Sequence, residues 1–429
     1  MVIALIQAAA AAPAAAGFDP ETATRAYLAT LQGAARAKSD AYFEGGYWLL
    51  LWGTLVGVAS HWLMLRMGWS AAWRDWAGRV TKRRWLQAGL YALPYVVFGS
   101  LIVLPWTIYT GHVREHQYGL SNQSFGAWLG EIGTALLVTL VMTAIMLTVI
   151  FAVIRRAPRT WWLWGAAAMV AMTAFALVVQ PLFVEPLFNK YTPMPAGPLR
   201  DQILTMAKAN HIPATNVWVV DASKQSKRIS GNVAGLGPTI RIALNDNLLN
   251  RSTPAEVKAV MGHEMGHYVL GHVWKGLAAF SVMILIAFLI LWRLTPWMLA
   301  RWGQSWRIES VADPAVVPAF AMILTVLILA MTPVLNTLIR TQESQADAFG
   351  LDAAREPDGF ASIAMKLSEY RKIEPSPLEE AIFFDHPSGR TRVRMSMDWK
   401  ARHLGELPPG QRAMVTPPPP AAAGPTAAR

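Results

Sequence analysis

A His-Glu-Met-Gly-His run at residues 263–267 holds the residue types found in hydrolytic zinc centres. On a helix, His263 and His267 lie one turn apart on one face, so both imidazoles can reach the same ion. Glu264 lies on the flank of that face, where it can contact a water held by the metal without ligating it. The alternative is a helix with two histidines on a polar face. The capped helix start at residues 253–256 weakens that alternative, and the pattern predicts a metal-dependent hydrolase.

A hydrolytic zinc site needs a third protein ligand and one open position. His272 is near in sequence, but on a continued helix it would lie about 180° from His263 and face away. We therefore expect His272 on a polar face or behind a ligand. Glu343 is the better candidate, because it follows an apolar stretch and shares a helical face with Asp347 four residues later. Asp347 would then orient a histidine ligand. The alternative is a solvated acidic helix start.

The surrounding chain predicts a membrane protein. Charged residues make up only 15% of the 429 residues, and the absence of cysteine excludes disulfides and thiolate ligands. The net charge of +11 gathers in short linkers, which argues against nucleic acid as a partner. Stretches long enough to cross a bilayer as helices of about 20 residues are 47–65, 86–108, 132–154, 161–184, 276–299 and 315–339.

The last two of these stretches predict how the site is assembled. They form a hairpin, so the helix before the first and the helix after the second emerge on the same side of the membrane. His267 and Glu343 can therefore meet near the membrane surface. The expected fold is mainly α, a polytopic bundle of about six to seven spans that encloses a cavity, with a small α+β zincin-like domain.

The domain organisation follows from the alternation of apolar and polar blocks. We expect four spans in 1–184, a catalytic segment in 185–274, the membrane hairpin in 275–340, a second catalytic segment in 341–403, and a disordered tail in 404–429. Residues 1–16 are either a signal-like segment or a half-inserted helix. Periodicity and turn residues predict helices at 199–209, 360–371 and 390–402, strands at 217–220 and 239–244, and a glycine-rich hairpin or bulge at 231–237.

Beyond the zinc run, several motifs point to one family. They are Pro-Trp at 105–106, Glu-His-Gln-Tyr-Gly-Leu-Ser-Asn-Gln at 115–123, Pro-Leu-Phe-Asn-Lys-Tyr-Thr-Pro at 186–193, and the segment 340–350. From about residue 85 to residue 392 the chain resembles the CAAX prenyl protease 1 family of integral-membrane zinc enzymes. The resemblance implies one Zn²⁺ on His263, His267 and Glu343, a lipid bilayer as surroundings, and peptide or protein substrates, prenylated ones included. We expect a multi-pass membrane protein that acts as a monomer.

The resemblance also assigns residues that would contact the substrate. His386, in a His-Pro pair, and Arg392 match a histidine and an arginine that face the substrate carbonyl in the family. A histidine donor and a fixed cation are what an oxyanion requires. The alternative is a turn histidine with surface arginines, because Arg390 and Arg394 are close competitors. Asn232 aligns with an asparagine on an edge strand that binds the substrate backbone by strand addition, although the following residues are smaller than in the family.

Two other functions fit part of this pattern. A quality-control peptidase of the heat-shock type shares the zinc run, but such chains have fewer spans than this one. A transporter or scaffold with a relic site would not need the intact Glu264. The linkers 66–84, 155–159 and 293–307 carry 6, 3 and 3 basic residues on the side opposite the catalytic segments. The positive-inside rule then predicts catalysis outside the cytoplasm, whereas the resemblance predicts the cytosolic side.

Overall fold

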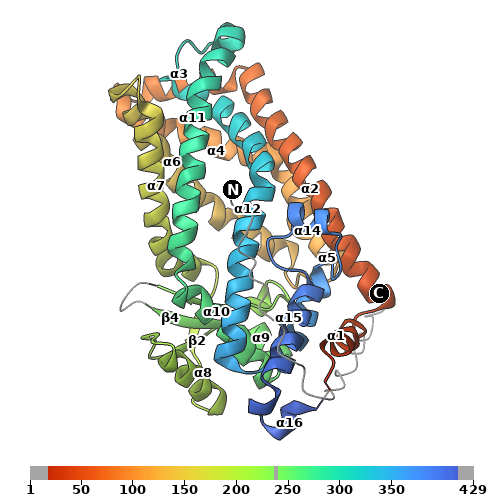
Figure 1. Ribbon diagram of the computed structural model, residues 1–429. Coiled ribbons are helices and arrows are strands. Elements are labelled where there is room, and N and C mark those ends of the chain that lie inside the picture. The colour runs from red at the N-terminus through yellow and green to blue at the C-terminus, as the bar shows by residue number, and fades with distance from the viewer. Residues whose placement is uncertain (1–17, 236–239, 414–429) are drawn as a thin grey trace, which may run out of the picture.

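The computed structural model describes residues 18–235 and 240–413. Within these residues, six helical segments are long and apolar enough to cross a membrane, which confirms the six expected stretches. The expected segment 1–16 lies outside the described residues. The helices of the bundle are α2 (Gly33–Arg66), α4 (Arg84–Ile108), α6 (Phe125–Arg156), α7 (Trp161–Val179), α11 (His272–Trp306) and α12 (Val317–Ala354). Figure 1 shows them as one elongated bundle.

Aromatic side chains fill the interior of the bundle at one end. Phe151, Trp161, Phe288 and Phe320 belong to one buried cluster, to which α4, α6, α7, α11 and α12 all contribute. Large apolar side chains elsewhere on the same helices face outward, for example Phe175, which is 65% exposed. Apolar residues on the outside are expected where lipid rather than water surrounds the helices.

The three basic linkers meet at the end of the bundle opposite the sheet (Figure 1). The first linker contains a helix that we did not expect, α3 (Trp69–Val80). Arg74 of α3 donates to the Arg307 carbonyl at 2.9 Å, and Arg155 donates to the Arg84 carbonyl at 2.5 Å. The basic residues therefore lie on the side that the sequence predicted, and the orientation in the membrane stays a prediction.

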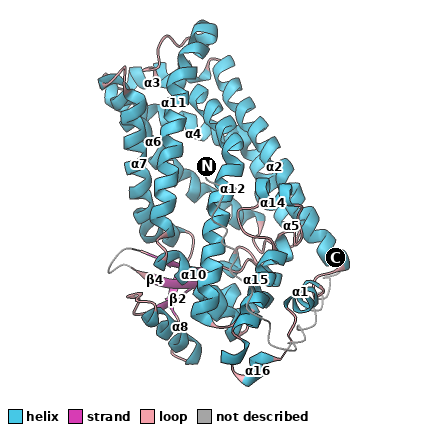
Figure 2. Ribbon diagram, in the orientation of Figure 1, coloured by secondary structure: helices cyan, strands magenta, loops and turns pink. Residues whose placement is uncertain are grey.

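A small mixed sheet lies at the other end, below the bundle in Figure 2. Its order is β1-β2-β4-β3, with β2 and β4 parallel and the outer pairs antiparallel. The strands are β1 (Tyr191–Pro193), β2 (Val217–Val220), β3 (Gly231–Ala234) and β4 (Arg241–Asn245). The two expected strands and the pairing of the glycine-rich segment are present, although residues 236–239 lie outside the described part. We did not foresee β1, whose three residues are too few for a periodic signal.

Three helices cover this sheet: α8 (Pro198–Ala209), α9 (Asp246–Arg251) and α10 (Pro254–Val269). The buried side chains between them form a second core, which includes Ile203, Ile242, Leu248, Met261 and Met265. The helix expected at 199–209 is confirmed. This core holds α10, and with it the zinc run, against the end of the membrane bundle.

The C-terminal segment packs on the same core. Its helices are α13 (Pro357–Leu367), α14 (Pro377–Phe383), α15 (Gly389–Arg402) and α16 (Pro409–Arg412). The helices expected around 360–371 and 390–402 are present. The N-terminal α1 (Pro20–Leu28) packs against α15, a contact between the two ends of the chain that local patterning does not reveal.

The expectation of a disordered tail from residue 404 is wrong for residues 404–413. Leu407 is buried in the sheet-side core, so its apolar side chain stabilises this part of the chain. Arg412 donates to the Leu407 carbonyl at 2.6 Å, and Lys400 donates to the Ala413 carbonyl at 2.9 Å. Residues 414–429 lie outside the described part.

Candidate metal centre

The helix that carries the zinc run begins with a complete capping box. The Thr253 hydroxyl accepts from the Glu256 amide, and the Glu256 carboxylate accepts from the Thr253 amide at 2.7 Å. Lys366 of α13 donates to the same carboxylate at 2.7 Å, so the cap is also a tertiary contact. Pro254 occupies the first turn, where its missing N–H has no cost. These contacts set the start of α10 and therefore the direction in which its histidines face.

Glycines bring α10 and α12 into backbone contact. A Cβ on Gly350 of α12 would lie 2.7 Å from the His263 nitrogen, and one on Gly262 would lie 2.9 Å from the Gly350 carbonyl oxygen. A Cβ on Gly266 would approach Ala346 to 3.1 Å. Any larger residue at these positions would push the helices apart. The glycines therefore allow short side chains on the two helices to reach one point.

At that point, His263, His267 and Glu343 gather their ligating atoms within 4.8 Å of one another. The Nε2 atoms of the two histidines are 3.1 Å apart. Glu343 places Oε2 at 3.2 Å from Nε2 of His263 and Oε1 at 3.4 Å from Nε2 of His267. Within residues 18–235 and 240–413, this is the one group of three or more such residues close enough to hold an ion.

The donor set fits a metal ion. The buried Oε2 atom of Glu343 makes no hydrogen bond of acceptable geometry, so a buried acceptor is left over. Two imidazole nitrogens and a carboxylate oxygen face the same space, which is the ligand chemistry of zinc in hydrolytic sites. Glu343 is buried, at 8% exposure, and lies within the continuous α12. These observations contradict the alternative of a solvated acidic helix start.

Asp347 lies one turn beyond Glu343 and contacts the centre from behind. It is fully buried and accepts from Nδ1 of His263 at 2.8 Å. Arg392 binds the same carboxylate with two donors, Nε at 2.9 Å and Nη2 at 2.5 Å. Burial opposes protonation of His263, but the hydrogen bond to Asp347 and the close carboxylate of Glu343 raise its pKa to about 10. Asp347 therefore holds one histidine and one arginine in fixed positions.

Of the three neighbouring arginines, Arg392 is the one that reaches this centre. Arg390 pairs with Glu374 at 2.9 Å and with Glu21 at 3.0 Å, far along the chain from the zinc run. Arg394 pairs with Glu21 at 2.7 Å. Both side chains are 44% exposed, whereas Arg392 as a residue is 7% exposed. Of the three arginines, therefore, Arg392 is the one whose position on α15 brings it to Asp347 and to the cleft beside the centre.

Removing the Asp347 carboxylate is expected to destabilise the protein strongly. In Asp347→Ala, the buried Arg392 keeps its charge without a partner, a situation that costs about 3–5 kcal/mol. We expect a large fall in the thermal midpoint of the solubilised protein. Arg390→Gln is the matched control, because its exposed ion pairs contribute only about 0–1 kcal/mol. Equal midpoints for the two variants would contradict this account of the buried pair.

A cleft of about 210 Å³ opens beside the centre. It is lined by polar side chains, Glu264, His386 and Arg392 among them, and by apolar side chains of α13. Burial raises the pKa of Glu264, while the nearby His263 and His267 oppose that rise. The cleft therefore brings a carboxylate, a histidine and a guanidinium to the metal-binding group.

His386 reaches the centre from the loop between α14 and α15. Its Nε2 lies 3.2 Å from Oε2 of Glu343, and its Nδ1 lies 2.8 Å from Oδ1 of Asp385. We did not predict Asp385 as the partner of this ring. An acidic residue directly before the His-Pro pair is the signal that could have identified it.

The edge strand expected beside the active centre is β3. Among the residues that the structure describes, it pairs with β4 only, which leaves its outer edge without a strand partner there. Gly231 lies next to Glu264, since a Cβ there would come within 3.5 Å of the Glu264 side chain. Asn232 is the next residue, and its buried Oδ1 has no hydrogen-bond partner. Gly231 lines the cleft itself, whereas Asn232 does not.

His272 does not face away, as a continued helix predicts, but lies behind the ligand candidate His267, which is the second of the two positions that we expected for it. The helix does not continue past Val269: Gly271 adopts a left-handed φ of +65°, and α11 starts at His272. The break turns the His272 ring back toward His267, with the two Nδ1 atoms 3.0 Å apart. The glycine was the signal, because left-handed glycines commonly end helices.

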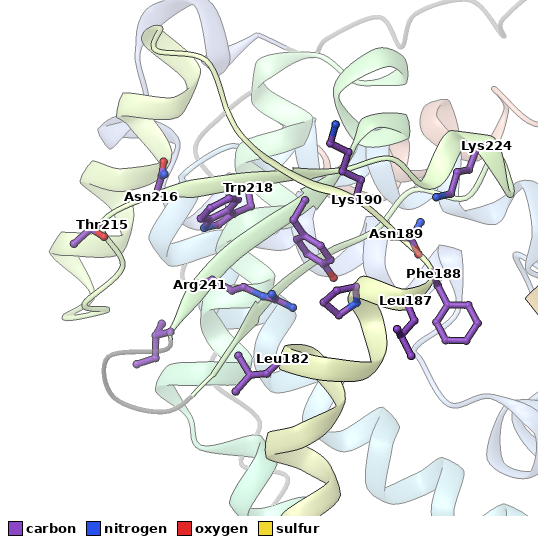
Figure 3. Close-up of a pocket in the computed structure, with 13 residues that line it drawn as sticks. Leu182, Leu187, Phe188, Asn189, Lys190, Thr215, Asn216, Trp218, Lys224 and Arg241 are labelled. Atoms are coloured by element: carbon purple, nitrogen blue, oxygen red, sulfur yellow. The ribbon is translucent and has the colours of Figure 1, made fainter. Parts of the chain in front are cut away.

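A larger cavity than the cleft beside the centre lies elsewhere, at the foot of α7 beside the neighbouring strands β1 and β2 (Figure 3). Its volume is about 940 Å³. Figure 3 shows Trp218 and Arg241 on the sheet side and Leu182 at the end of the membrane helix. None of the site residues predicted from the sequence lines this cavity. The candidate active site is therefore identified by the metal-binding side chains and not by the size of a cavity.

Two family models together cover most of the chain. Residues 193–399 match peptidase family M48, and residues 25–190 match the CAAX prenyl protease N-terminal domain with five membrane helices. An uncharacterized metalloprotease of Bacillus subtilis is 27% identical over 345 residues, which cover 79% of this chain and 81% of the relative. CAAX prenyl protease 1 of Saccharomyces cerevisiae is 25% identical over 68% of each chain, and its Arabidopsis thaliana homolog is 28% identical over 70% of each.

A solved structure shares the fold. The crystal structure of Ste24p from S. mikatae superposes with a TM-score of 0.69 and 20% sequence identity, covering 88% of this chain and 94% of that one. The arrangement of a long helix bundle with a small sheet-bearing domain at one end is therefore a known architecture.

Proposed function

This chain belongs to peptidase family M48, among the CAAX prenyl proteases, and we propose that it is a zinc endopeptidase cutting near the C-termini of peptides and proteins, prenylated ones included. It is a multi-pass integral-membrane metalloprotease. The observation that carries the proposal is the meeting of His263 and His267 from α10 with Glu343 from α12. The heat-shock type of quality-control protease is disfavoured, because the membrane helices match the CAAX prenyl protease model.

Zinc is the metal that this donor set favours, and His263, His267 and Glu343 would hold it. A bound zinc ion would supply Lewis acidity, which acidifies water and polarises a carbonyl group. Two histidines and one glutamate leave a position open for chemistry, as in other hydrolytic zinc sites. The remaining steps are assigned to protein side chains.

Glu264 is the proposed general base and acid. Its carboxylate takes a proton from the attacking water and passes it to the leaving amine nitrogen. His386 would stabilise the negative charge that develops on the carbonyl oxygen. Because Asp385 accepts from Nδ1 of His386, the ring can donate through Nε2 only when both nitrogens carry hydrogen.

Two more residues would position groups in the cleft. Arg392, fixed by two hydrogen bonds to Asp347, presents its guanidinium at the cleft wall and adds positive potential there. The outer edge of β3 would bind an extended peptide by strand addition, and Asn232 lies on that strand with a buried side-chain oxygen that has no hydrogen-bond partner among the described residues. Asp347 acts indirectly, by orienting His263 and Arg392.

His386→Ala is expected to lower kcat by about 10²- to 10³-fold, the effect of losing one oxyanion donor. KM should change little, because the donor strengthens its contact only in the transition state. Steady-state kinetics on a fluorogenic peptide measures both constants. His403→Ala is the control, since that ring stacks on Trp399 and does not line the cleft. A loss confined to KM would contradict the assigned role.

The substrate class is tested with matched peptides in lipid nanodiscs. Wild type is expected to cleave a peptide that carries a farnesylated cysteine near its C-terminus. Its kcat/KM should be at least about tenfold above that of the unmodified peptide, because burial of each methylene group stabilises the bound state by ~0.8 kcal/mol. An S-alkylated peptide of equal hydrophobicity controls for membrane partitioning. Cleavage of a misfolded membrane protein, with none of the prenylated peptide, would favour the quality-control alternative.

A further inference from the structure

His272 contacts the metal-binding group through His267. Its ring is buried, at 3% exposure, although it lies at the start of a membrane helix. The Nδ1 atoms of His272 and His267 are 3.0 Å apart, and their ring planes cross at 73°. Gly271 makes this contact possible, because its left-handed φ of +65° ends the helical path of α10 and lets the chain turn before α11 begins at His272.

The other ring nitrogen of His272 contacts α12. Its Nε2 lies 3.1 Å from Oε1 of Gln345, which stands between Glu343 and Asp347 in the sequence. An amide oxygen can only accept a hydrogen bond, so Nε2 of His272 carries the hydrogen. Its Nδ1 then has a lone pair and accepts from Nδ1 of His267. The Nε2 lone pair of His267 is left facing Glu343.

The opposite direction of hydrogen bonding is incompatible with ligation. If the Gln345 amide nitrogen instead donated to Nε2 of His272, the hydrogen of His272 would lie on Nδ1 and would be donated to Nδ1 of His267. The hydrogen of His267 would then lie on its Nε2. That hydrogen would point at Nε2 of His263, only 3.1 Å away, and would block the lone pair needed for a metal. One tautomer of His267 is therefore selected by the contact with His272.

We propose that His272 and Gln345 form a neutral hydrogen-bond relay that fixes the tautomer and ring orientation of His267. This inference rests on the proposed metal site. His263 is held by the charged Asp347, whereas His267 is held by uncharged groups. A second carboxylate behind His267 would add negative charge beside Glu343 and Glu264, and the relay orients the ring without that addition. Both residues are positioning residues, because they act through His267.

The test compares zinc affinity in two variants of His272. Chelator competition on the full-length protein is expected to give about 10- to 100-fold weaker zinc binding for His272→Leu, the usual loss when the hydrogen-bond partner of a ligand is removed. His272→Asn keeps an acceptor near the position of Nδ1 and should stay within about threefold of wild type by the same argument. Visible absorption of the Co²⁺-loaded proteins should show a changed spectrum for the leucine variant only.

Variants of Gln345 test the outer half of the relay. Gln345 is exposed, so water can take over as acceptor, and Gln345→Leu should lose only a few-fold in affinity. Gln345→Glu keeps the acceptor and should bind zinc at least as tightly as wild type. Thermal unfolding of the metal-free proteins shows whether a substitution has damaged the fold, and these milder variants keep the test decisive if His272→Leu does not fold.

Two results would overturn the relay. Equal affinity of His272→Leu and wild type would show that His267 needs no partner, and equal losses in the leucine and asparagine variants would show that packing, not hydrogen bonding, matters. Absence of zinc binding in wild type would instead contradict the proposed function itself, so the two failures are distinguishable.

Discussion

Glu264→Gln should lower kcat for peptide cleavage by about 10³- to 10⁴-fold, the upper part of the range for general acid–base catalysis. The expected loss is large because one carboxylate both takes the proton from water and delivers it to the leaving amine. Glutamine has nearly the same shape but cannot accept the proton. The side chain is not among the three metal-binding residues, so zinc content should remain one per chain.

The measurement is single-turnover cleavage of a farnesylated peptide, with zinc determined on the same samples. Glu406→Gln is a suitable control, because that glutamate pairs with Arg355 on the exposed surface. Unchanged cleavage by Glu264→Gln at full zinc occupancy would show that another group moves the proton.

Glu343→Ala is expected to lose zinc and, with it, activity. The substitution removes a direct ligand, so the fall in affinity should exceed the 10- to 100-fold loss typical of an outer hydrogen-bond partner. Cleavage should then be undetectable at nanomolar zinc and return in part at high zinc. The physical reason is that two histidines alone leave too few protein ligands for a hydrolytic zinc site.

Asp352→Asn is the control on the same helix. Asp352 accepts a hydrogen bond from Trp399 at 2.7 Å and takes no part in the metal-binding group. Its variant should bind zinc like wild type. Retention of zinc at nanomolar concentration by Glu343→Ala would remove Glu343 from the ligand set.

Much of this centre could be predicted from the sequence because its signals are local. The spacing of His263 and His267 on one helical face is a matter of helix periodicity, and Glu343 follows from the geometry of a membrane hairpin. The strand at 217–220 and the helix at 199–209 also have clear patterns. Each of these predictions uses only the types of residues near one another in the sequence and the length of helix that crosses a bilayer.

The remainder depends on tertiary contacts that no local pattern carries. The close approach of α10 and α12 requires Gly262, Gly266 and Gly350 to face one another, which is visible only once the helices are paired. The break at Gly271 also matters, because a continued helix predicts that His272 faces away from His263, whereas the turn brings it to His267. Leu407 gave no sign that it is buried, because its neighbours are polar and proline-rich.

The central claim is that a membrane hairpin completes a zinc site begun on α10, and anomalous diffraction at the zinc edge tests it most directly. Crystals of the full-length protein grown with zinc should show one strong anomalous peak per chain. We predict that it lies about 2.0–2.2 Å from Nε2 of His263, Nε2 of His267 and a carboxylate oxygen of Glu343. No peak at this position, or a peak coordinated by both histidines without Glu343, would contradict the account.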